Sequence, residues 1–515
     1  ADIITASAGT SNFRAGVNAG NSIASGGNYN TVIGDEAGTA LTTGDGVVAI
    51  GFEALATEDA NGTTTAIGYQ ALKVQNAGAE SNNTAVGYQA GTAVTTGTSN
   101  TFIGTEAGLS QTSGGENVAV GMQALRAEDS HGQNTAVGHQ ALEDQNAGAN
   151  GNNTAVGHIA GRRMTTGIDN TLIGKSAGTA LTDADSNIAI GMEALFSDTK
   201  GNFNIAIGKH ALYTQNFSSS TNSDNIAIGY RAGVDLTDGQ RNILIGSIAG
   251  EEITDADDTI AIGYRAGGGN AGAATTGHDN VCIGTDSGSV LTSGQSNTFI
   301  GRNSGSQITT GASNSILGRY QGNSGGLDIR TGSNNIVLSG GDGIPRLAVI
   351  DNAGNGTTRV FTPDEGVFVC SESSSGSTWS IFKGISDADD IMGTNGNTRY
   401  VVFGNGNVQN QNNSYGAISD QTLKENIEDA SSQWNDIKAL QIRKYSFIED
   451  DLDAPNQLGV IAQELETAGM DGLVQEVDNL KAVKYSILYM KAVKALQEAM
   501  TRIETLESKV ATLEG

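Results

Sequence analysis

The stretch Asn83-Thr84-Ala85-Val86-Gly87 is one copy of the unit that decides the fold of most of this chain. Across residues 27–340 the unit reads N-[TIV]-[AFLVC]-[IV]-G-x-x-[AS]-[GL] and is followed by a polar turn. A period of about 17 residues is too short for a helical hairpin and is typical of one coil of a β-solenoid. The marker glycine occurs 17 times, at Gly34, Gly51, Gly68, Gly87, Gly104, Gly121, Gly138, Gly157, Gly174, Gly191, Gly208, Gly229, Gly246, Gly263, Gly284, Gly301 and Gly318.

A longer period is superimposed on the short one. The marker glycines at 34, 104 and 174 are 70 residues apart, and those at 174, 246 and 318 are 72 apart. Four coils therefore form a super-repeat that occurs about four times. The longer coils contain insertions such as 217–221 and 268–271, which we expect to form loops on one face of the solenoid.

Alternation along the strand predicts which side chains share a face. Thr84 and Val86 fall on one face and Ala85 on the other. We expect the strict Ile/Val position to point into the coil, and the Ala-dominated position to form a second dry surface where subunits approach closely. We also expect the recurrent Asn and Gly to lie at corners, with Asn side chains able to form a ladder between coils. The Ile/Val position is held by Ile33, Ile50, Ile67, Val86, Ile103, Val120 and Val137 in the first coils.

Composition limits the possible partners. The chain has a formal net charge of −28, so it should repel nucleic acid and anionic membrane surfaces. No apolar run approaches the ~18 residues that span a bilayer, so we expect no membrane insertion. Cys282 takes the place of an Ala in the repeat, which predicts a buried small side chain rather than a disulfide.

The character of the chain changes at Ser419. Of the 72 glycines only Gly459, Gly469, Gly472 and Gly515 lie beyond it. The stretch Ser419-Asp420-Gln421-Thr422-Leu423-Lys424 continues into Glu425-Asn426-Ile427. This pattern, S-D-x-x-L-K-x-N-I, resembles the start of the C-terminal intramolecular chaperone of phage endosialidase tail spikes, tail fibres and neck appendages. Residues 458–464, 485–488 and a terminal heptad helix fit the same family, so the resemblance covers residues 419–515.

The resemblance implies a self-cleavage site at the junction, with the scissile bond between Ile418 and Ser419. A serine needs a base to become a nucleophile, and a lysine with a lowered pKa can serve. The implied roles are Ser419 as nucleophile and Lys424 as general base, with Asp420 and Asn426 as supporting residues. From the residues alone, Ser419 and Asp420 could equally cap a helix that begins near Gln421. The two interpretations are compatible.

The last part of the tail, from about residue 482, is predicted to be one long helix. Its heptads favour a coiled coil, for which three strands would match a trimeric body. The alternative is a single amphipathic helix that folds onto its own domain. The heptad core positions are Tyr489, Leu496, Ile503 and Val510 at one site and Ala492, Ala499, Leu506 and Leu513 at the other.

Two segments lie outside the repeat and the tail. Residues 341–418 contain apolar runs separated by Gly, Asn and Asp turns, which predicts a β-rich neck or knob. The runs are 347–350, 358–361, 366–369 and 399–403. Residues 1–26 lack a clear period and are either an attachment segment or a degenerate first coil.

The repeat signature is similar to the head domain of trimeric autotransporter adhesins, a left-handed parallel β-roll made by three chains. The 17-residue spacing is longer than that family's usual repeat. We therefore expect a mainly β protein: a trimeric β-solenoid shaft over 27–340, a β-rich neck over 341–418, and an α+β chaperone domain over 419–515 that ends in a coiled-coil helix.

The function expected from these features is that of a homotrimeric virion tail fibre or appendage, made in the host cytoplasm. It would bind other tail proteins and a glycan or protein receptor on the host surface. The alternatives are a bacterial surface adhesin with the same chaperone and a glycan-depolymerising tail spike. Single-turnover self-cleavage is the one enzymatic activity expected, with no cofactor and no metal. His139 and His158, and the acidic turns 182–185 and 254–258, are interpreted as surface features.

Overall fold

The computed structural model describes residues 3–4, 7–60, 62–78, 80–268, 272–352, 355–360, 366–370, 380–386, 397–403, 408–410, 427–445, 457–477 and 480–515. The chain divides into two compact units, Ala1–Ser414 and Tyr415–Gly515, and each is described by itself.

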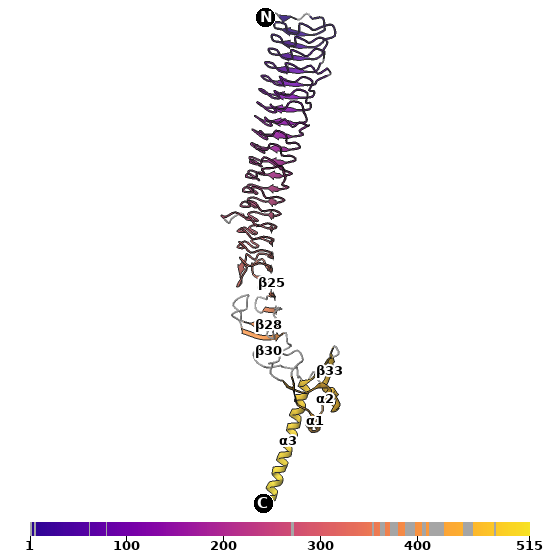
Figure 1. Cartoon of the computed structure of the whole chain (residues 1–515), viewed down its shortest axis with the longest axis vertical. Coiled ribbons are helices and arrows are strands. Elements are labelled where there is room, and N and C mark those ends of the chain that lie inside the picture. Colours follow the sequence, from indigo (N-terminus) through magenta and orange to yellow (C-terminus); the bar gives the residue numbers. More distant parts are fainter. Residues whose placement is uncertain are drawn as a thin grey trace. The chain divides into compact units, whose positions relative to one another are not determined.

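The first unit is a β-solenoid of about 19 coils, which confirms the predicted fold class (Figure 1). Each coil contributes one short strand that pairs in parallel and in register with the next, as Ala85 does with Phe102. The coil strands are β2 Phe13–Ala15, β3 Thr31–Ile33, β4 Val48–Ile50, β5 Thr65–Ile67, β6 Thr84–Val86, β7 Thr101–Ile103, β8 Val118–Val120, β9 Thr135–Val137, β10 Thr154–Val156, β11 Thr171–Ile173, β12 Ile188–Ile190, β14 Ile205–Ile207, β16 Ile226–Ile228, β17 Ile243–Ile245, β18 Ile260–Ile262, β19 Val281–Ile283, β20 Thr298–Ile300, β21 Ser315–Leu317 and β24 Ile336–Ser339.

Two coils lie beyond the 17 found from the marker glycine. Strand β2 pairs in parallel with β3, so the segment 1–26 contributes a degenerate first coil, and its role in attachment stays a prediction. Strand β24 pairs in parallel with β21 and closes the stack. Strand β1 Ile3–Ile4 pairs antiparallel with β2 at the start of the ladder. Short additional strands lie outside the main ladder: β13 Gly201–Asn202, β15 Thr221–Asn222, β22 Asn323–Ser324 and β23 Leu327–Asp328.

The predicted facing of the strand was wrong. The middle position of the strand points into the coil: Ala85, Phe102 and Ala206 are fully buried. The Ile/Val position points outward, and Ile103 is 40% exposed. Alternation alone defines two faces without saying which is inside. The coil is narrow, so the inner position needs a small side chain in most coils, whereas β-branched residues suit the outer pleated surface.

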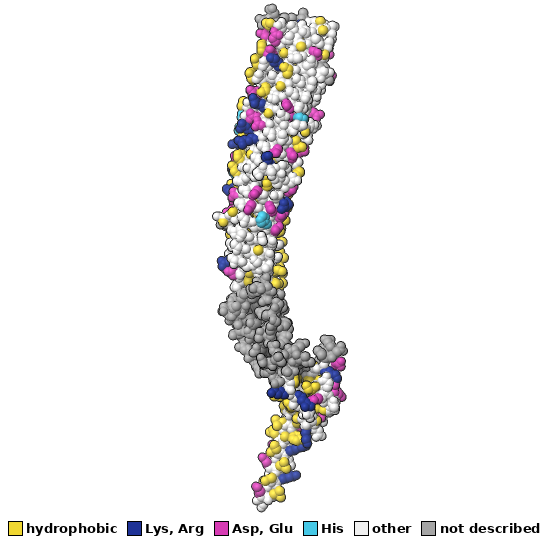
Figure 2. Space-filling view, viewed as in Figure 1, with side chains coloured by type: hydrophobic (Ala, Val, Ile, Leu, Met, Phe, Trp, Pro, Cys, Tyr) yellow, Lys and Arg dark blue, Asp and Glu magenta, His cyan; other side chains and the backbone are white. Residues whose placement is uncertain are grey.

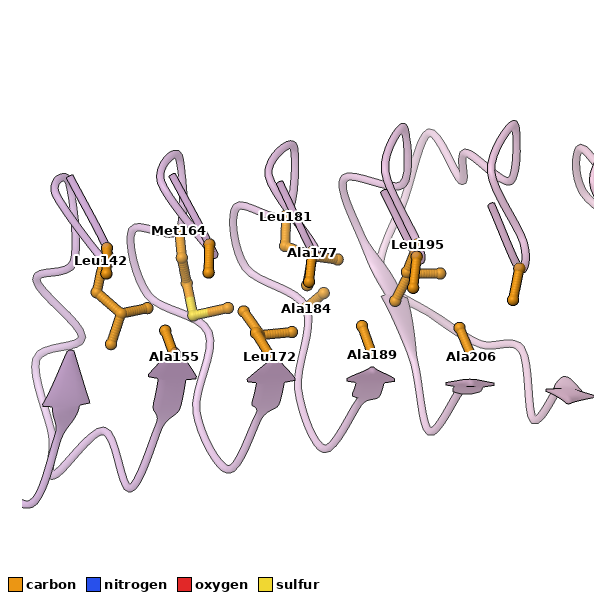
Figure 3. Packing of buried hydrophobic residues seen from close by; sticks show 14 of the residues in the cluster. Leu142, Ala155, Met164, Leu172, Ala177, Leu181, Ala184, Ala189, Leu195 and Ala206 are labelled. Atoms are coloured by element: carbon orange, nitrogen blue, oxygen red, sulfur yellow. The ribbon is translucent and has the colours of Figure 1, made fainter. Parts of the chain in front are cut away.

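Figure 3 shows this interior, with Ala155, Leu172, Ala189 and Ala206 pointing from their strands toward Leu142, Met164, Leu181 and Leu195 on the opposite wall. Cys282 takes the inner position in its coil and is fully buried, as predicted. Burial raises the pKa of its thiol to about 12.

Conservation of interior volume explains the four-coil super-repeat. A large inner residue recurs every fourth coil, and the wall opposite it carries glycine. A Cβ added at Gly108 would lie 2.5 Å from the ring of Phe102, and one at Gly178 would lie 2.8 Å from Leu172. In the next two coils of the first three super-repeats the strand carries alanine and the wall carries leucine, as with Ala119 and Leu125. In the fourth super-repeat the wall carries Gly267 and Gly288 instead. The large inner residues at this spacing are Val32, Phe102, Leu172, Leu244 and Ile316, and Phe299 is a further large inner residue that falls outside it.

This pairing predicts a compensating double variant. Phe102→Ala should lower the free energy of unfolding by about 3–5 kcal/mol because it leaves a cavity. Gly108→Leu alone should also destabilise, since the new side chain would meet the Phe102 ring. The two changes together reproduce the arrangement of Ala119 and Leu125 and should restore most of the loss. Denaturant melts of the three variants would measure the coupling, and purely additive losses would contradict the pairing.

Two backbone features hold neighbouring coils together. Gly104 has φ +139°, and a Cβ there would lie 2.4 Å from the carbonyl oxygen of Gly121, so the marker position requires glycine. The recurrent asparagines form a buried ladder: the Asn100 side-chain carbonyl accepts the N–H of Asn117 at 3.0 Å, and the Asn100 amide donates to the Gly114 carbonyl at 3.0 Å. Each asparagine thus satisfies backbone groups of the following coil.

Antiparallel strands follow the last coil. They are β25 Pro345–Asn352, β26 Asn355–Val360, β27 Gly366–Cys370, β28 Ser380–Ser386, β29 Asn397–Phe403 and β30 Val408–Asn410. Each pairs with the one before it, beginning with β25 on β24. The described part of the predicted neck is therefore β-rich.

The second unit is a small α+β module that ends in a long helix. Its elements are α1 Trp434–Ala439, β31 Arg443–Tyr445, β32 Gln457–Gly459, α2 Ala462–Thr467, the 3₁₀ turn η2 Asp471–Leu473, β33 Val474–Val477, β34 Leu480–Val483 and α3 Tyr485–Glu514. Strands β31 and β32 pair antiparallel, as do β33 and β34. The long helix begins at Tyr485, slightly later than predicted, because residues 480–483 belong to β34.

Candidate functional site

The residues predicted to form the cleavage site lie outside the described residues. This applies to Ile418, Ser419, Asp420, Lys424 and Asn426, and the structure describes the chain again from residue 427. The Ser419–Lys424 dyad and the alternative helix cap therefore both stay predictions.

A small apolar core holds together the module that follows the junction. It consists of Val460, Leu465, Met470, Leu473 and Leu488. These side chains come from the end of β32, α2, the η2 turn and α3. One cluster thus fixes the start of the long helix to the rest of the module.

Polar contacts tie α1 to α3. The Lys491 ammonium lies 2.7 Å from an Asp436 carboxylate oxygen. Glu498 accepts the backbone N–H of Gln433 at 3.0 Å, and this N–H directly precedes α1. The Arg502 guanidinium lies 4.4 Å from the centre of the Trp434 ring, a cation–π contact. The segment 491–502 of α3 is therefore partly covered by α1 and the residues before it.

The later turns of α3 are fully exposed. Every residue from 501 to 515 is exposed, and the heptad positions Ile503, Leu506 and Val510 are each at least half exposed. Figure 2 shows hydrophobic side chains along this helix. Leu488 and Ala495 hold the first half of α3 against its own module, whereas the heptad positions Tyr489 and Leu496 are 61% and 62% exposed. The exposed apolar stripe therefore runs along both halves of the helix, and the coiled coil stays a prediction.

An apolar groove of about 360 Å³ lies between α1 and α3. It is lined by Trp434, Ile437, Ala492, Leu496 and Ala499. Three of these are heptad core positions, so the groove and the exposed stripe form one continuous apolar face on α3.

Comparison with known proteins identifies this module. Residues 419–478 match the model of the family described as chaperone of endosialidase. The segment from the predicted junction through β33 is a domain of that family. No curated protein and no solved structure was found to be similar to the chain.

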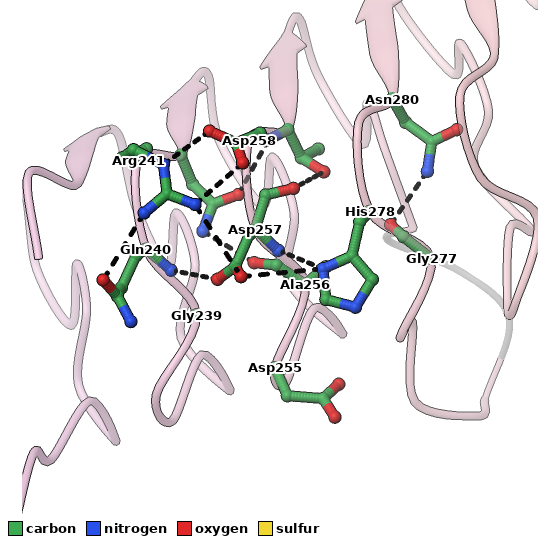
Figure 4. Close-up of polar contacts among 12 residues, drawn as sticks. Gly239, Gln240, Arg241, Asp255, Ala256, Asp257, Asp258, Gly277, His278 and Asn280 are labelled. Carbon is green, nitrogen blue, oxygen red and sulfur yellow. Dashed lines mark hydrogen bonds and ion pairs between the residues drawn. The ribbon is translucent and has the colours of Figure 1, made fainter.

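The acidic turns of the shaft have a structural role in the described residues. Asp257 accepts the backbone N–H of Gln240, 17 residues earlier, at 2.7 Å, and Asp258 pairs with Arg241 at 2.7 Å. His278 lies beside them, and its Nδ1 accepts the N–H of Asp257 at 2.9 Å. Figure 4 shows these contacts joining neighbouring coils. The carboxylates are thus used as corner contacts between coils, in agreement with the interpretation of these turns as surface features.

The histidine pair at 139 and 158 forms part of an outer row of rings. The two imidazoles stack with centroids 5.1 Å apart. In earlier coils the same row contains Phe52, Tyr69 and Tyr88, whose rings stack at 5.4 and 5.2 Å. The position after the marker glycine therefore carries two separate stacks of rings, with Thr105 and Met122 between them.

Sequence reasoning missed one cluster of potential metal ligands. Ligand atoms of Glu128, Asp129 and His131 lie within 4.8 Å of one another. Glu128 is fully buried, and burial raises the pKa of its carboxyl to about 7. A hydrogen bond from the Ser130 hydroxyl lowers the pKa of Asp129. A Glu-Asp-x-His stretch inside a repeat was the available sequence signal.

Among the described residues, no helix is long and apolar enough to cross a lipid bilayer.

Proposed function

We propose that this chain is a homotrimeric virion tail fibre or appendage protein that attaches to a host surface. Its C-terminal chaperone would assemble three shafts and then cleave itself off between Ile418 and Ser419. The observation that carries the proposal is the chaperone-of-endosialidase domain at residues 419–478, which directly follows a β-solenoid shaft and its β-rich segment.

The outer strand surface supports self-association of the shaft. We call the first and third residues of the 17 coil strands from β3 to β21, which exclude β13 and β15, the outer strip. It contains only Thr, Ser, Val, Ile and Leu, and in a chain with a net charge of −28 it carries no charged residue. Two copies that met through their acidic surfaces would repel each other, whereas two copies that met through the uncharged outer strip would not.

The size of the strip also fits an interface between copies. At about 4.8 Å per coil and about 10 Å across, 17 coils offer roughly 800 Å² per copy, the area that each partner buries in a standard-size interface. The stripe on α3 adds Ile503, Leu506 and Val510 to the apolar surface that parallel copies could share.

A separate assembly domain has a physical reason here. Neighbouring coils are near-copies, so parallel shafts could pair one coil out of register at little cost. A tail that trimerises first would set the register and raise the local concentration of shafts. Cleavage would then leave a fibre that is slow to dissociate, which is kinetic stability.

The proposal predicts a trimer that depends on the outer strip. Light scattering on native protein should give about three times the mass of the shaft. The double variant Ile207→Asp and Ile245→Asp places charges on the strip, and should weaken association of shaft lacking the tail while each solenoid stays folded. Thr165→Ala, in an exposed turn, is the matched control. A monomer or dimer at micromolar concentration would contradict the proposal.

A further inference from the structure

A buried acidic side chain recurs at the same place in the first three super-repeats of the shaft. Glu58, Glu128 and Asp198 are spaced by 70 residues and are all fully buried. In two of the three cases a glutamine in the next coil donates a hydrogen bond to the buried carboxylate. Gln75 Nε2 donates to Glu58 Oε2 at 2.9 Å, and Gln215 Nε2 donates to Asp198 Oδ2 at 2.7 Å.

The middle member of the series has lost this donor. Gln145, the equivalent glutamine, turns its Nε2 to the Gly167 carbonyl at 3.2 Å. Glu128 Oε2 is buried and has no hydrogen-bond partner among the described residues. One coil earlier, Gln111 is also buried and its Oε1 likewise has no partner there. Buried polar atoms are rarely left unpaired, so unpaired acceptors on two stacked coils indicate an occupant, a donor or a cation, that the described side chains do not supply.

The same place gathers further ligand atoms. Gln111 Nε2 donates to the His131 carbonyl at 3.0 Å, which holds its amide against this loop. His131 Nδ1 lies 3.7 Å from Glu128 Oε1, and one ligand atom from each of Glu128, Asp129 and His131 lies within 4.8 Å of the other two. Asp129 and His131 are half-buried, so an ion could enter from solvent.

We propose that Glu128, Asp129 and His131 bind a divalent cation of the zinc type, with the side-chain carbonyl of Gln111 completing the site. Two carboxylates would balance the charge of the ion, and an imidazole nitrogen together with carboxylate oxygens is a donor set that suits Zn²⁺ better than Ca²⁺ or Mg²⁺. The ion would replace the missing glutamine donor and join the coils that contain residues 111 and 128. The proposed metal site does not depend on the role proposed for the C-terminal domain.

The test uses the untagged full chain, stripped with a chelator and dialysed against ZnCl₂, with CaCl₂ and MgCl₂ as comparisons. We expect one zinc ion per chain by elemental analysis, a thermal midpoint that rises with zinc, and slower hydrogen exchange in residues 127–133. Glu128→Gln and His131→Ala should each weaken zinc binding by more than about tenfold. His131 is half-buried, so its variant keeps the test valid if Glu128→Gln folds poorly.

Glu58→Gln is the matched control, because this acid occupies the same place one super-repeat earlier and has its Gln75 donor. It should leave the zinc content and the zinc-dependent midpoint unchanged. The proposal is overturned if wild-type protein retains less than stoichiometric zinc, or if zinc content is the same in wild type, Glu128→Gln and His131→Ala.

Discussion

Replacing Ala206 with aspartate should lower the free energy of unfolding of the surrounding coils by about 3–5 kcal/mol. Ala206 is fully buried, and so are Leu212 on the opposite wall of its coil and Leu195 on the wall of the preceding coil. An aspartate there would place a charge among apolar side chains with no donor to compensate it. Because each coil contacts only its neighbours, the loss should be concentrated near this coil. Thermal melts and hydrogen exchange of residues 188–232 would measure it.

The next residue provides the control. Ile207→Asp changes the outer strip, where the new carboxylate can reach water, so it should cost the isolated shaft much less than Ala206→Asp. Ala206→Ser, a small polar change at the same inner position, should give an intermediate loss. Equal losses for Ala206→Asp and Ile207→Asp in monomeric shaft would mean that the strand does not face as described.

The period of the repeat could be predicted from sequence, whereas the facing of its strand could not. Gly87 and its equivalents mark each coil because a positive φ and close stacking exclude a Cβ. The alternation of Thr84, Ala85 and Val86 does not say which face of the strand is buried. Val86 is more apolar than Ala85, so apolarity predicts the wrong inner face. The width of the coil decides which face of the strand is inside. The only sign of this width in the sequence is that strand and wall residues compensate in size: Phe102 is paired with Gly108, whereas Ala119 is paired with Leu125.

The Ser419 junction and the Glu128 cluster also differ in how far they can be predicted from sequence. The junction at Ser419 is a local motif, so its residues can be named from sequence although they lie outside the described residues. The cluster at Glu128 depends on stacking. Gln111 and Gln145 lie 17 residues before and after Glu128, and they become its neighbours only because successive coils stack. That Gln145 donates to Gly167 rather than to Glu128 is visible only in three dimensions.

Wild-type protein should be recovered as two pieces, residues 1–418 and 419–515, whereas Ser419→Ala should remain one chain. The reaction would begin with attack of the Ser419 hydroxyl on the Ile418 carbonyl. The peptide C–N bond breaks as an ester forms, and water then hydrolyses the ester to leave a carboxylate on Ile418 and a free amine on Ser419. Denaturing electrophoresis and intact mass would show the pieces, and the smaller one should begin at Ser419.

The base is tested separately from the nucleophile. Lys424→Ala should block or greatly slow cleavage, because an unactivated serine is a poor nucleophile at neutral pH. Lys438→Ala removes a lysine of α1 outside the motif and should cleave like wild type. Ser419→Ala and Lys424→Ala should still assemble, since the apolar core around Leu465 and Leu473 needs neither side chain. If assembled wild-type chains stay intact on long incubation, the domain is an assembly domain without self-cleavage. If Lys424→Ala cleaves at the wild-type rate, Ser419 is activated by another base.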